Sequence, residues 1–493
     1  MLPDAASPGP ASLMMLLAWF GSLFTAPSFR TFCGLACGFL AQAGRRTVCG
    51  MLAGAGLSRC SPHDRAHQFF SRARWNADDL GLAAAKLVVA LLAPTGQPVT
   101  VAIDDTLFRR RGKNVWAAGW FHDGSARGPA TTGYGNNWVI AAIVVKLPMV
   151  KRPVALPVLA KLVIKGTNSA SRLWLACRMA QMLAGALPGR RIHVVADAAY
   201  AGEELKKLPP SVTWTTRLRK DAALYELPPG RTGRRGRPRA KGVRLPSLDV
   251  LARRAAFGPV TVTRYGKTAT IHAEATTCLW HGVFGPRRVQ VLLIRDVSAT
   301  GYDLALVTTD LDASPAAVIE RYASRWSIEV AIEDARQVFG AGQAPSRTAR
   351  AVERTIPFQL ACQAIATCWY ATAGHDPTDT EDHRARAPGT RPRPSRPPRT
   401  WPPSSAASSS PQDLRQLAPT SQHPKKSESS AWPGKTSPHN RESRVIRSGP
   451  NRRPSAFQHR TSSHELRHGR KATLKEIAHI GGSARGYKSS PHR

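Results

Sequence analysis

The sequence is poor in acidic residues: its 493 residues include 32 Asp and Glu against 70 Lys and Arg, a formal net charge of +38. So large a positive excess points to a polyanionic partner, with nucleic acid the leading candidate. The excess is not confined to one end. Residues 384–493 carry 23 Lys and Arg against 5 Asp and Glu, which leaves 47 against 27 for residues 1–383.

Cysteine is scarce and scattered. None of the eight cysteines has a His or a second Cys pair at zinc-finger spacing, and they are scattered through apolar context. They are Cys33, Cys37, Cys49, Cys60, Cys177, Cys278, Cys362 and Cys368. We therefore predict reduced core thiols in a cytoplasmic protein.

Long hydrophobic runs are also lacking. The most apolar stretch near the start, residues 11–26, is shorter than the roughly 20 residues that span a bilayer, and no Lys or Arg precedes it. This pattern favours a buried N-terminal helix over a signal peptide or a membrane span, and no membrane partner is expected.

The chain is long enough for two to four domains. Residues 11–92 are helical in pattern throughout, interrupted by glycines and by Ser61-Pro62, so we predict an N-terminal helical domain over residues 1–95. Its arginines suit either DNA binding or no direct role, since a purely structural cap explains the same pattern.

The pattern then changes to strands. Residues 98–106 (PVTVAIDDT), 136–148 and 153–165 are rich in β-branched and apolar residues, and a helix is predicted from Ser171 to Leu187. A strand (RIHVVADAAY) and a further strand (VTWTTRLR) follow. Three hairpin-linked strands, a helix and further strands are the element order of the ribonuclease H-like fold.

A helix is predicted over residues 314–340, because Ser314 and Pro315 suit a helix start and Gly340 a helix end. On an ideal helix, four polar residues fall within an arc of roughly 60°: Tyr322, Arg325, Glu329 and Arg336. The opposite side is apolar and should be buried: Ile328, Ala331, Ala335 and Phe339. Without acidic partners elsewhere, the polar stripe would be only a solvated helix face with an Arg325 to Glu329 pair.

The spacing Tyr-x2-Arg-x3-Glu-x6-Arg resembles the Tyr-Arg-Glu-Lys signature of DDE transposases of bacterial insertion sequences, with Arg336 where the family usually has lysine. The resemblance implies two aspartates on upstream strands. Asp105, directly before Thr106, matches the first, and Asp197 matches the second. Asp104 and Asp105 are predicted to close the first strand, and Asp197 the fourth.

Two other acidic residues compete for these roles. Asp104 is the alternative first carboxylate, because strand alternation places Asp104 and Asp105 on opposite faces and only one can point into the site. Glu333 is a weaker rival for Glu329, one helical turn further on.

The resemblance implies that Asp105, Asp197 and Glu329 hold two Mg²⁺ or Mn²⁺ ions, which would activate an attacking oxygen and stabilise a leaving one. It assigns DNA contacts to Tyr322 and to the guanidinium groups of Arg325 and Arg336. The implied partners are double-stranded DNA, both the terminal inverted repeats of a transposon and the target, with a homodimer in the DNA complex.

The resemblance also divides the chain. The catalytic core is expected in two parts, residues 96–220 and 289–375, separated by a β-rich insertion with a basic loop at residues 221–288. Within that loop, Arg235 and Arg237 match the core of minor-groove AT-hook peptides, although contacts to phosphate explain them more simply. The predicted fold class is α/β: a ribonuclease H-like mixed sheet with helices, an N-terminal helical domain, a β-rich insertion and a disordered C-terminal tail.

From residue 376 onward, and most clearly after residue 384, the sequence is rich in Pro, Ser and Arg with little apolar periodicity, so this tail is expected to be disordered. We hypothesise that a frameshift replaced the native C-terminus; the rival is a genuine basic arm that binds DNA.

The predicted function is a transposase acting in the bacterial cytoplasm at the nucleoid. Two alternatives stay open. One is an impaired copy that acts only as a DNA-binding regulator, and the other is a ribonuclease H-like nuclease without strand transfer.

Overall fold

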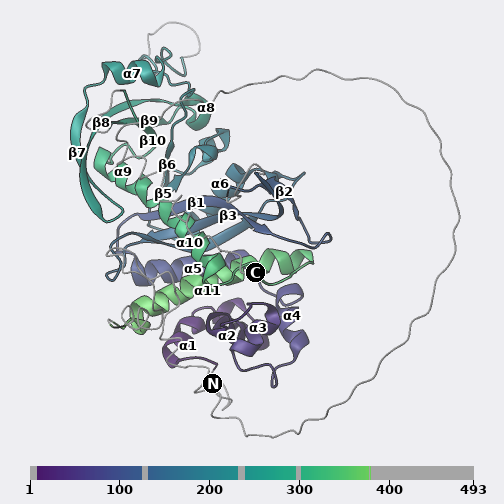
Figure 1. Ribbon diagram of the computed structural model, residues 1–493. Helices are drawn as coiled ribbons and strands as arrows, with labels where there is room; N and C mark the ends of the chain where they lie inside the picture. The colour runs from purple at the N-terminus through teal and green to yellow at the C-terminus, as the bar shows by residue number, and fades with distance from the viewer. Residues whose placement is uncertain (1–7, 125–130, 231–238, 296–300, 377, 379–493) are drawn as a thin grey trace, which may run out of the picture. The chain divides into compact units, whose positions relative to one another are not determined.

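The computed structural model describes residues 8–124, 131–230, 239–295, 301–376 and 378. Its centre is a ten-stranded mixed sheet with the strand order β2-β3-β1-β5-β6-β10-β9-β8-β7, in which β4 also pairs with β3 (Figure 1). The predicted α/β class, a mixed sheet with helices, is confirmed. The predicted disordered tail lies outside the described residues.

Five strands form the part of the sheet that the sequence pattern predicted. They are β1 (Val99–Arg109), β3 (Thr132–Val145), β4 (Val154–Leu162), β5 (Ile192–Ala196) and β6 (Val212–Arg217). β1 pairs antiparallel with β3 and parallel with β5, and β5 pairs parallel with β6. This is the strand arrangement of a ribonuclease H-like sheet. A short strand, β2 (Gly119–His122), was not predicted.

The remaining strands extend the same sheet beyond β6. β10 (Leu304–Thr308) pairs antiparallel with β6 and with β9 (Arg288–Arg295). β8 (Lys267–Leu279) and β7 (Gly258–Arg264) follow, with the short helices α7 (Leu248–Arg254) and α8 (His281–Phe284) nearby in sequence. The strand-like pieces predicted in the insertion therefore form an outer continuation of the main sheet.

The two faces of the sheet carry different helices. On β1, Val101 and Ile103 share a core with α6 (Arg172–Ala186), while Ala102 shares another core with Ile328 and Ala331 of α10 (Trp326–Gln337). Successive side chains of a strand point to opposite faces. Any residue of β1 that follows this alternation is thereby assigned to the α6 face or to the α10 face.

The predicted single helix over residues 314–340 is two helices, α9 (Pro315–Ser324) and α10, which meet at Arg325. At this junction the backbone hydrogen bonds span three residues instead of the four of an α-helix: Arg325 N–H donates to Tyr322 O, and Ile328 N–H donates to Arg325 O. The apolar side behaves as predicted, because its four residues are all buried: Ile328, Ala331, Ala335 and Phe339.

The N-terminal region is helical, as predicted. It contains α1 (Ala11–Ala18), α2 (Ala26–Ala41), α3 (Val48–Gly54), α4 (His63–Ser71) and α5 (Ala77–Leu92). The long helix α11 (Ala349–Trp369) contacts β4 and α10 as well as α2 and α4, so it joins these helices to the sheet (Figure 1). Phe358 of α11 meets the rings of Phe32 and Phe69 edge-on.

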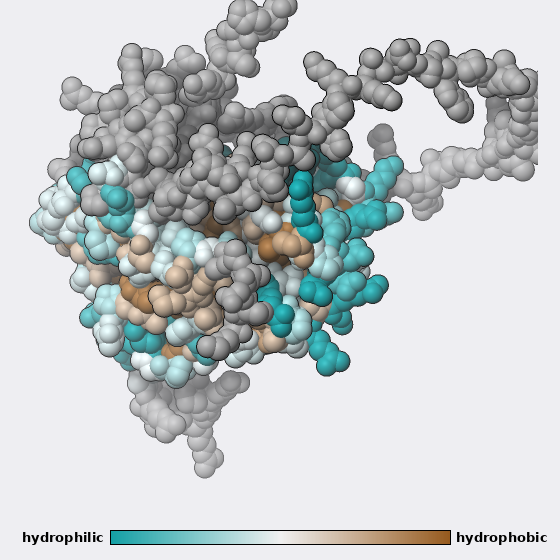
Figure 2. All heavy atoms as spheres, turned by 90° about the horizontal axis from the view of Figure 1, so that it is seen from below, coloured by the Kyte–Doolittle hydropathy of each residue, from teal (hydrophilic) through white to brown (hydrophobic). Residues whose placement is uncertain are grey.

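Figure 2 shows brown hydrophobic residues in several separate patches between white and teal ones on the face seen from below. No helix among the described residues has the length and apolar character needed to cross a membrane.

Six cysteines are buried as predicted, but the prediction was wrong for Cys49 and Cys60, which are exposed.

Candidate active site

The alternation of β1 decides which of its two aspartates faces α10. Asp104 has the parity of Ala102 and therefore points to the α10 face, whereas Asp105 has the parity of Ile103 and points to the α6 face. Both lie within β1, which continues to Arg109, so the prediction that they close the strand was wrong. Their carboxylates consequently have separate surroundings.

Asp104 meets the glutamate of α10 through one arginine. Arg325 Nη2 lies 2.8 Å from Glu329 Oε1, and Arg325 Nη1 lies 3.5 Å from Asp104 Oδ2. The arginine side chain is only 14% exposed. A guanidinium between two carboxylates favours the charged form of all three groups, because each opposite charge stabilises the other.

Asp197 directly follows β5, as predicted for the second aspartate. Its Oδ1 accepts a hydrogen bond of 2.8 Å from Ala199 N–H, and its backbone O accepts one from Thr216 Oγ1. Its negative charge acts on both Asp104 and Glu329. The parallel pairing of β1 with β5 is what carries Asp197 to the same region as Asp104.

The pKa values reflect this crowding of acidic groups. Burial raises the pKa of Asp104 to about 7, against the lowering effect of Arg325, and the charges of Glu329 and Asp197 raise it further. Burial also raises the pKa of Glu329, again opposed by Arg325. Burial disfavours the charged form of Arg325, but the negative charges of Glu329 and its neighbours outweigh this effect and raise the arginine pKa.

Asp105, the sequence's first choice, is engaged elsewhere. Its Oδ2 lies 2.8 Å from Arg172 Nε and accepts a 3.1 Å hydrogen bond from Asn137 Nδ2, while its Oδ1 accepts one from the Tyr200 hydroxyl. These partners belong to α6, β3 and the turn after β5. The structure therefore brings Asp104, the rival, and not Asp105 to the arginine that holds Glu329.

Of the two remaining residues of the polar stripe, one lies at the acidic group and the other does not. Tyr322 lies beside Arg325, with 6.0 Å between its ring centre and the guanidinium carbon, and burial raises its pKa. Arg336 donates to Thr106 Oγ1 and to Leu107 O at the end of β1, and so does not join the acidic group.

Glu333, the weaker rival for the third carboxylate, does not join the site. Glu333 is exposed and accepts a hydrogen bond from Gln337, so it does not replace Glu329. Arg235 and Arg237 lie outside the described residues.

Sequence reasoning missed Tyr265. It occupies the turn between β7 and β8 with a left-handed φ of 52°, followed by Gly266 with φ 76°. Burial raises its pKa, and the charges of Arg325 and Glu329 both act on it, so the hairpin tip lies near the acidic group. A Tyr-Gly pair between two strand patterns was the available signal for the turn, but nothing in it indicated its neighbours.

The acidic residues suit hard divalent cations by their chemistry. All three side chains offer oxygen, which Mg²⁺ and Mn²⁺ prefer. The carboxylates of Asp104, Asp197 and Glu329 do not converge on one point. Among the described residues, one group of three His, Cys, Asp or Glu side chains has its ligand atoms within 4.8 Å of one another, and that group does not include these carboxylates. Two ions about 4 Å apart do not require that, because each has its own ligands.

The group that does converge consists of Cys49, His63 and His67 in the N-terminal helices, and sequence reasoning missed it. Two histidines four residues apart on a predicted helix were the available signal, since such residues share a face.

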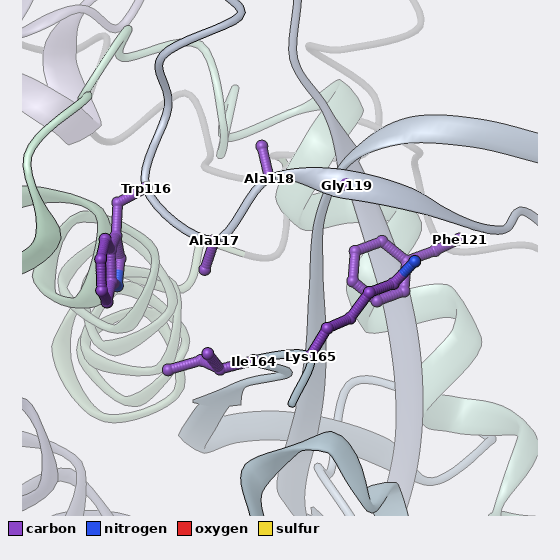
Figure 3. A pocket seen from close by; sticks show the side chains of 7 residues that line it. All are labelled: Trp116, Ala117, Ala118, Gly119, Phe121, Ile164 and Lys165. Atoms are coloured by element: carbon purple, nitrogen blue, oxygen red, sulfur yellow. The ribbon is translucent and has the colours of Figure 1, made fainter. Parts of the chain in front are cut away.

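The pocket in Figure 3, of about 180 Å³, is also separate from the acidic residues: it is lined by residues of the segment 116–121 together with Ile164 and Lys165.

Acidic side chains on adjacent parallel strands of a ribonuclease H-like sheet, joined by a glutamate from a helix, are the arrangement of a metal-dependent nuclease. The comparison with known families agrees: the family model described as DDE superfamily endonuclease matches residues 20–285, more than half of the chain, and the chain belongs to this family. The match includes Asp104, Asp105 and Asp197 and ends before Glu329. A search of curated proteins found no match.

Proposed function

We propose that this endonuclease-family protein is a DNA transposase, which cuts DNA at the ends of a mobile element and joins the freed 3′ ends to target DNA. The observation that carries the proposal is the ion-pair bridge from Asp104 through Arg325 to Glu329, between residues 225 positions apart in sequence. It unites the family-matched β1 with a helix beyond the matched region. That helix carries the transposase-like spacing.

Asp104, Asp197 and Glu329 would hold two Mg²⁺ or Mn²⁺ ions. When bound, such ions lower the barrier to in-line displacement at phosphorus by activating the attacking oxygen and stabilising the leaving one. We assign the first role to Asp104 because Asp105 is held by Arg172 on the opposite face of the sheet.

The neighbouring side chains have different tasks. Arg325 holds the Glu329 carboxylate in place and balances the negative charge of the acidic group. Tyr322, beside it, is suited to stack on a displaced base or to bond a phosphate. Arg336 ties α10 to the end of β1 through Thr106 and Leu107, so we assign it a positioning role rather than a phosphate contact.

The expected substrate is double-stranded DNA, both the inverted repeats at the element's ends and the target. The net charge of +38 supports a polyanionic partner. Two transposon ends cut in one complex would suit a homodimer. These partners, and a place in the bacterial cytoplasm, follow from the resemblance to insertion-sequence transposases.

The test is an assay that separates cutting from joining. A labelled duplex carrying the DNA that flanks the gene is incubated with the protein, a supercoiled target plasmid and Mg²⁺ or Mn²⁺. We expect nicks at the element's ends and labelled plasmid. Cutting without joining would favour a nuclease without strand transfer, and binding without cutting would favour a DNA-binding regulator.

Variants test the site assignment within the same assay. Asp104→Asn, Asp197→Asn and Glu329→Gln should bind the duplex but neither cut nor join it. Asp105→Asn is the matched control, since it removes a neighbouring carboxylate that faces α6 and should retain cutting. Retained cutting by Asp197→Asn, or loss of cutting in Asp105→Asn with Asp104→Asn active, would overturn the assignment.

A further inference from the structure

Three potential metal ligands meet where α3 and α4 pack together. Cys49 lies in the first turn of α3, and His63 and His67 lie one turn apart on α4. Cys49 Sγ is 2.9 Å from His63 Nε2 and 3.9 Å from His67 Nε2. All three side chains are exposed. None of them contributes to the acidic site on the sheet.

The distances suit a tetrahedral ion. Zn–S and Zn–N bonds of about 2.3 and 2.0 Å at a tetrahedral angle place sulfur and nitrogen about 3.5 Å apart. The two observed sulfur to nitrogen distances lie on either side of this value. The imidazole rings lie 4.5 Å apart between centres and are tilted by 47°, so both present a nitrogen to the same thiol.

We propose that Cys49, His63 and His67 form a Zn²⁺ site that fastens α3 to α4. One thiolate and two imidazoles are borderline-soft donors, which select zinc over Mg²⁺. Exposure leaves the fourth position open to water.

The site would have a structural effect on the N-terminal helices. Residues 55–62 connect α3 to α4 and include Gly56 in a left-handed conformation. An ion bound to both helices binds the folded arrangement and not the unfolded chain, so its binding free energy adds to the stability of the fold. Bound zinc should therefore stabilise this helical region without changing the acidic site.

The experiment uses Co²⁺ as a spectroscopic substitute for zinc. The full-length protein is treated with EDTA, freed of the chelator under reducing conditions and titrated with Co²⁺. We expect a near-ultraviolet charge-transfer band from cobalt and thiolate that saturates at one equivalent and disappears when Zn²⁺ is added. Oxygen ligands alone give no thiolate band, so binding at Asp104, Asp197 and Glu329 does not imitate the result.

Variants locate the band. Cys49→Ser should abolish it, and His63→Asn or His67→Asn should weaken Co²⁺ binding by more than about tenfold, while circular dichroism shows unchanged helix content. Cys60→Ser is the matched control: it removes the other exposed thiol and should leave the band intact. Absence of a band in the wild-type protein, an unchanged band in Cys49→Ser or loss of the band in Cys60→Ser would overturn the proposal.

Discussion

Replacing Arg325 with methionine tests how the acidic group is balanced. The change removes the positive charge between Glu329 and Asp104, at 2.8 and 3.5 Å, and keeps a side chain of similar length. Loss of one partner of a buried ion pair costs about 3–5 kcal/mol. The Glu329 side chain is 33% exposed, and water offsets part of that cost, so we expect a loss of about 2–3 kcal/mol.

Divalent ions should reverse this loss. Without the guanidinium, the carboxylates repel one another, and an added cation relieves the repulsion. Stabilisation by a bound ion follows its concentration relative to its dissociation constant, so Arg325→Met should gain more thermal stability from Mn²⁺ than the wild-type protein gains. The melting temperatures are measured with and without Mn²⁺ at pH 8, above the Asp104 pKa of about 7 in the wild-type protein; loss of Arg325 raises that pKa, and bound Mn²⁺ favours the charged carboxylate.

Arg336→Met supplies the matched control for Arg325→Met. It removes the same kind of charge from α10, the helix that begins directly after Arg325, but its hydrogen bonds go to Thr106 and Leu107 O. Its gain from Mn²⁺ should equal that of the wild-type protein. The reasoning is refuted if Arg325→Met is as stable as the wild type without Mn²⁺, or if its gain from Mn²⁺ is no larger.

Two predictions concern stability away from the acidic residues. Gly81→Ala in α5 should destabilise the fold by about 1–3 kcal/mol in thermal unfolding, because the new Cβ would lie 2.3 Å from Val158 O; Gly185→Ala in α6, with nothing within 4 Å, should be neutral or stabilising. Burial, with the nearby Arg321, lowers the pKa of His193 from 6.5 to about 4. The contribution of neutral His193 to the free energy of unfolding is therefore complete above pH 6.5 and falls by up to about 3 kcal/mol toward pH 4.

The sign for His193 follows from proton binding. Between pH 6.5 and 4 the unfolded chain binds a proton that the folded protein excludes, so acid favours unfolding. Asp310, 3.7 Å away, opposes the shift but does not cancel it. His193→Asn should lose stability less steeply over this range, and an equal slope in both proteins would contradict the account.

Equal melting temperatures for Gly81→Ala and Gly185→Ala would contradict the packing argument.

The sequence was informative about the strands of the sheet and ambiguous about the first carboxylate. Apolar and β-branched runs predicted β1, β3, β4, β5 and β6 because burial requires such residues locally. Alternation also predicted that Asp104 and Asp105 face opposite ways. It could not say which face meets the glutamate, because that depends on Ile328 of α10 packing against the Ala102 side, a contact between distant segments.

The break between α9 and α10 was not predictable from periodicity. Residues 322–328 contain neither Gly nor Pro. The backbone dihedral angles of Arg325 stay in the helical region, but its backbone hydrogen bonds span three residues instead of four. The cluster of Cys49 with two histidines was missed for a related reason. Its members come from two helices, and the search for local ligand spacing does not detect side chains that only helix packing unites.

The most direct test of the central claim is to locate Mn²⁺ by anomalous scattering in crystals of the protein bound to DNA. We expect anomalous peaks within coordination distance of the carboxylate oxygens of Asp104, Asp197 and Glu329, beside the scissile phosphate. Peaks at Asp105 on the α6 face instead, or no peak near these three carboxylates, would contradict the proposed site.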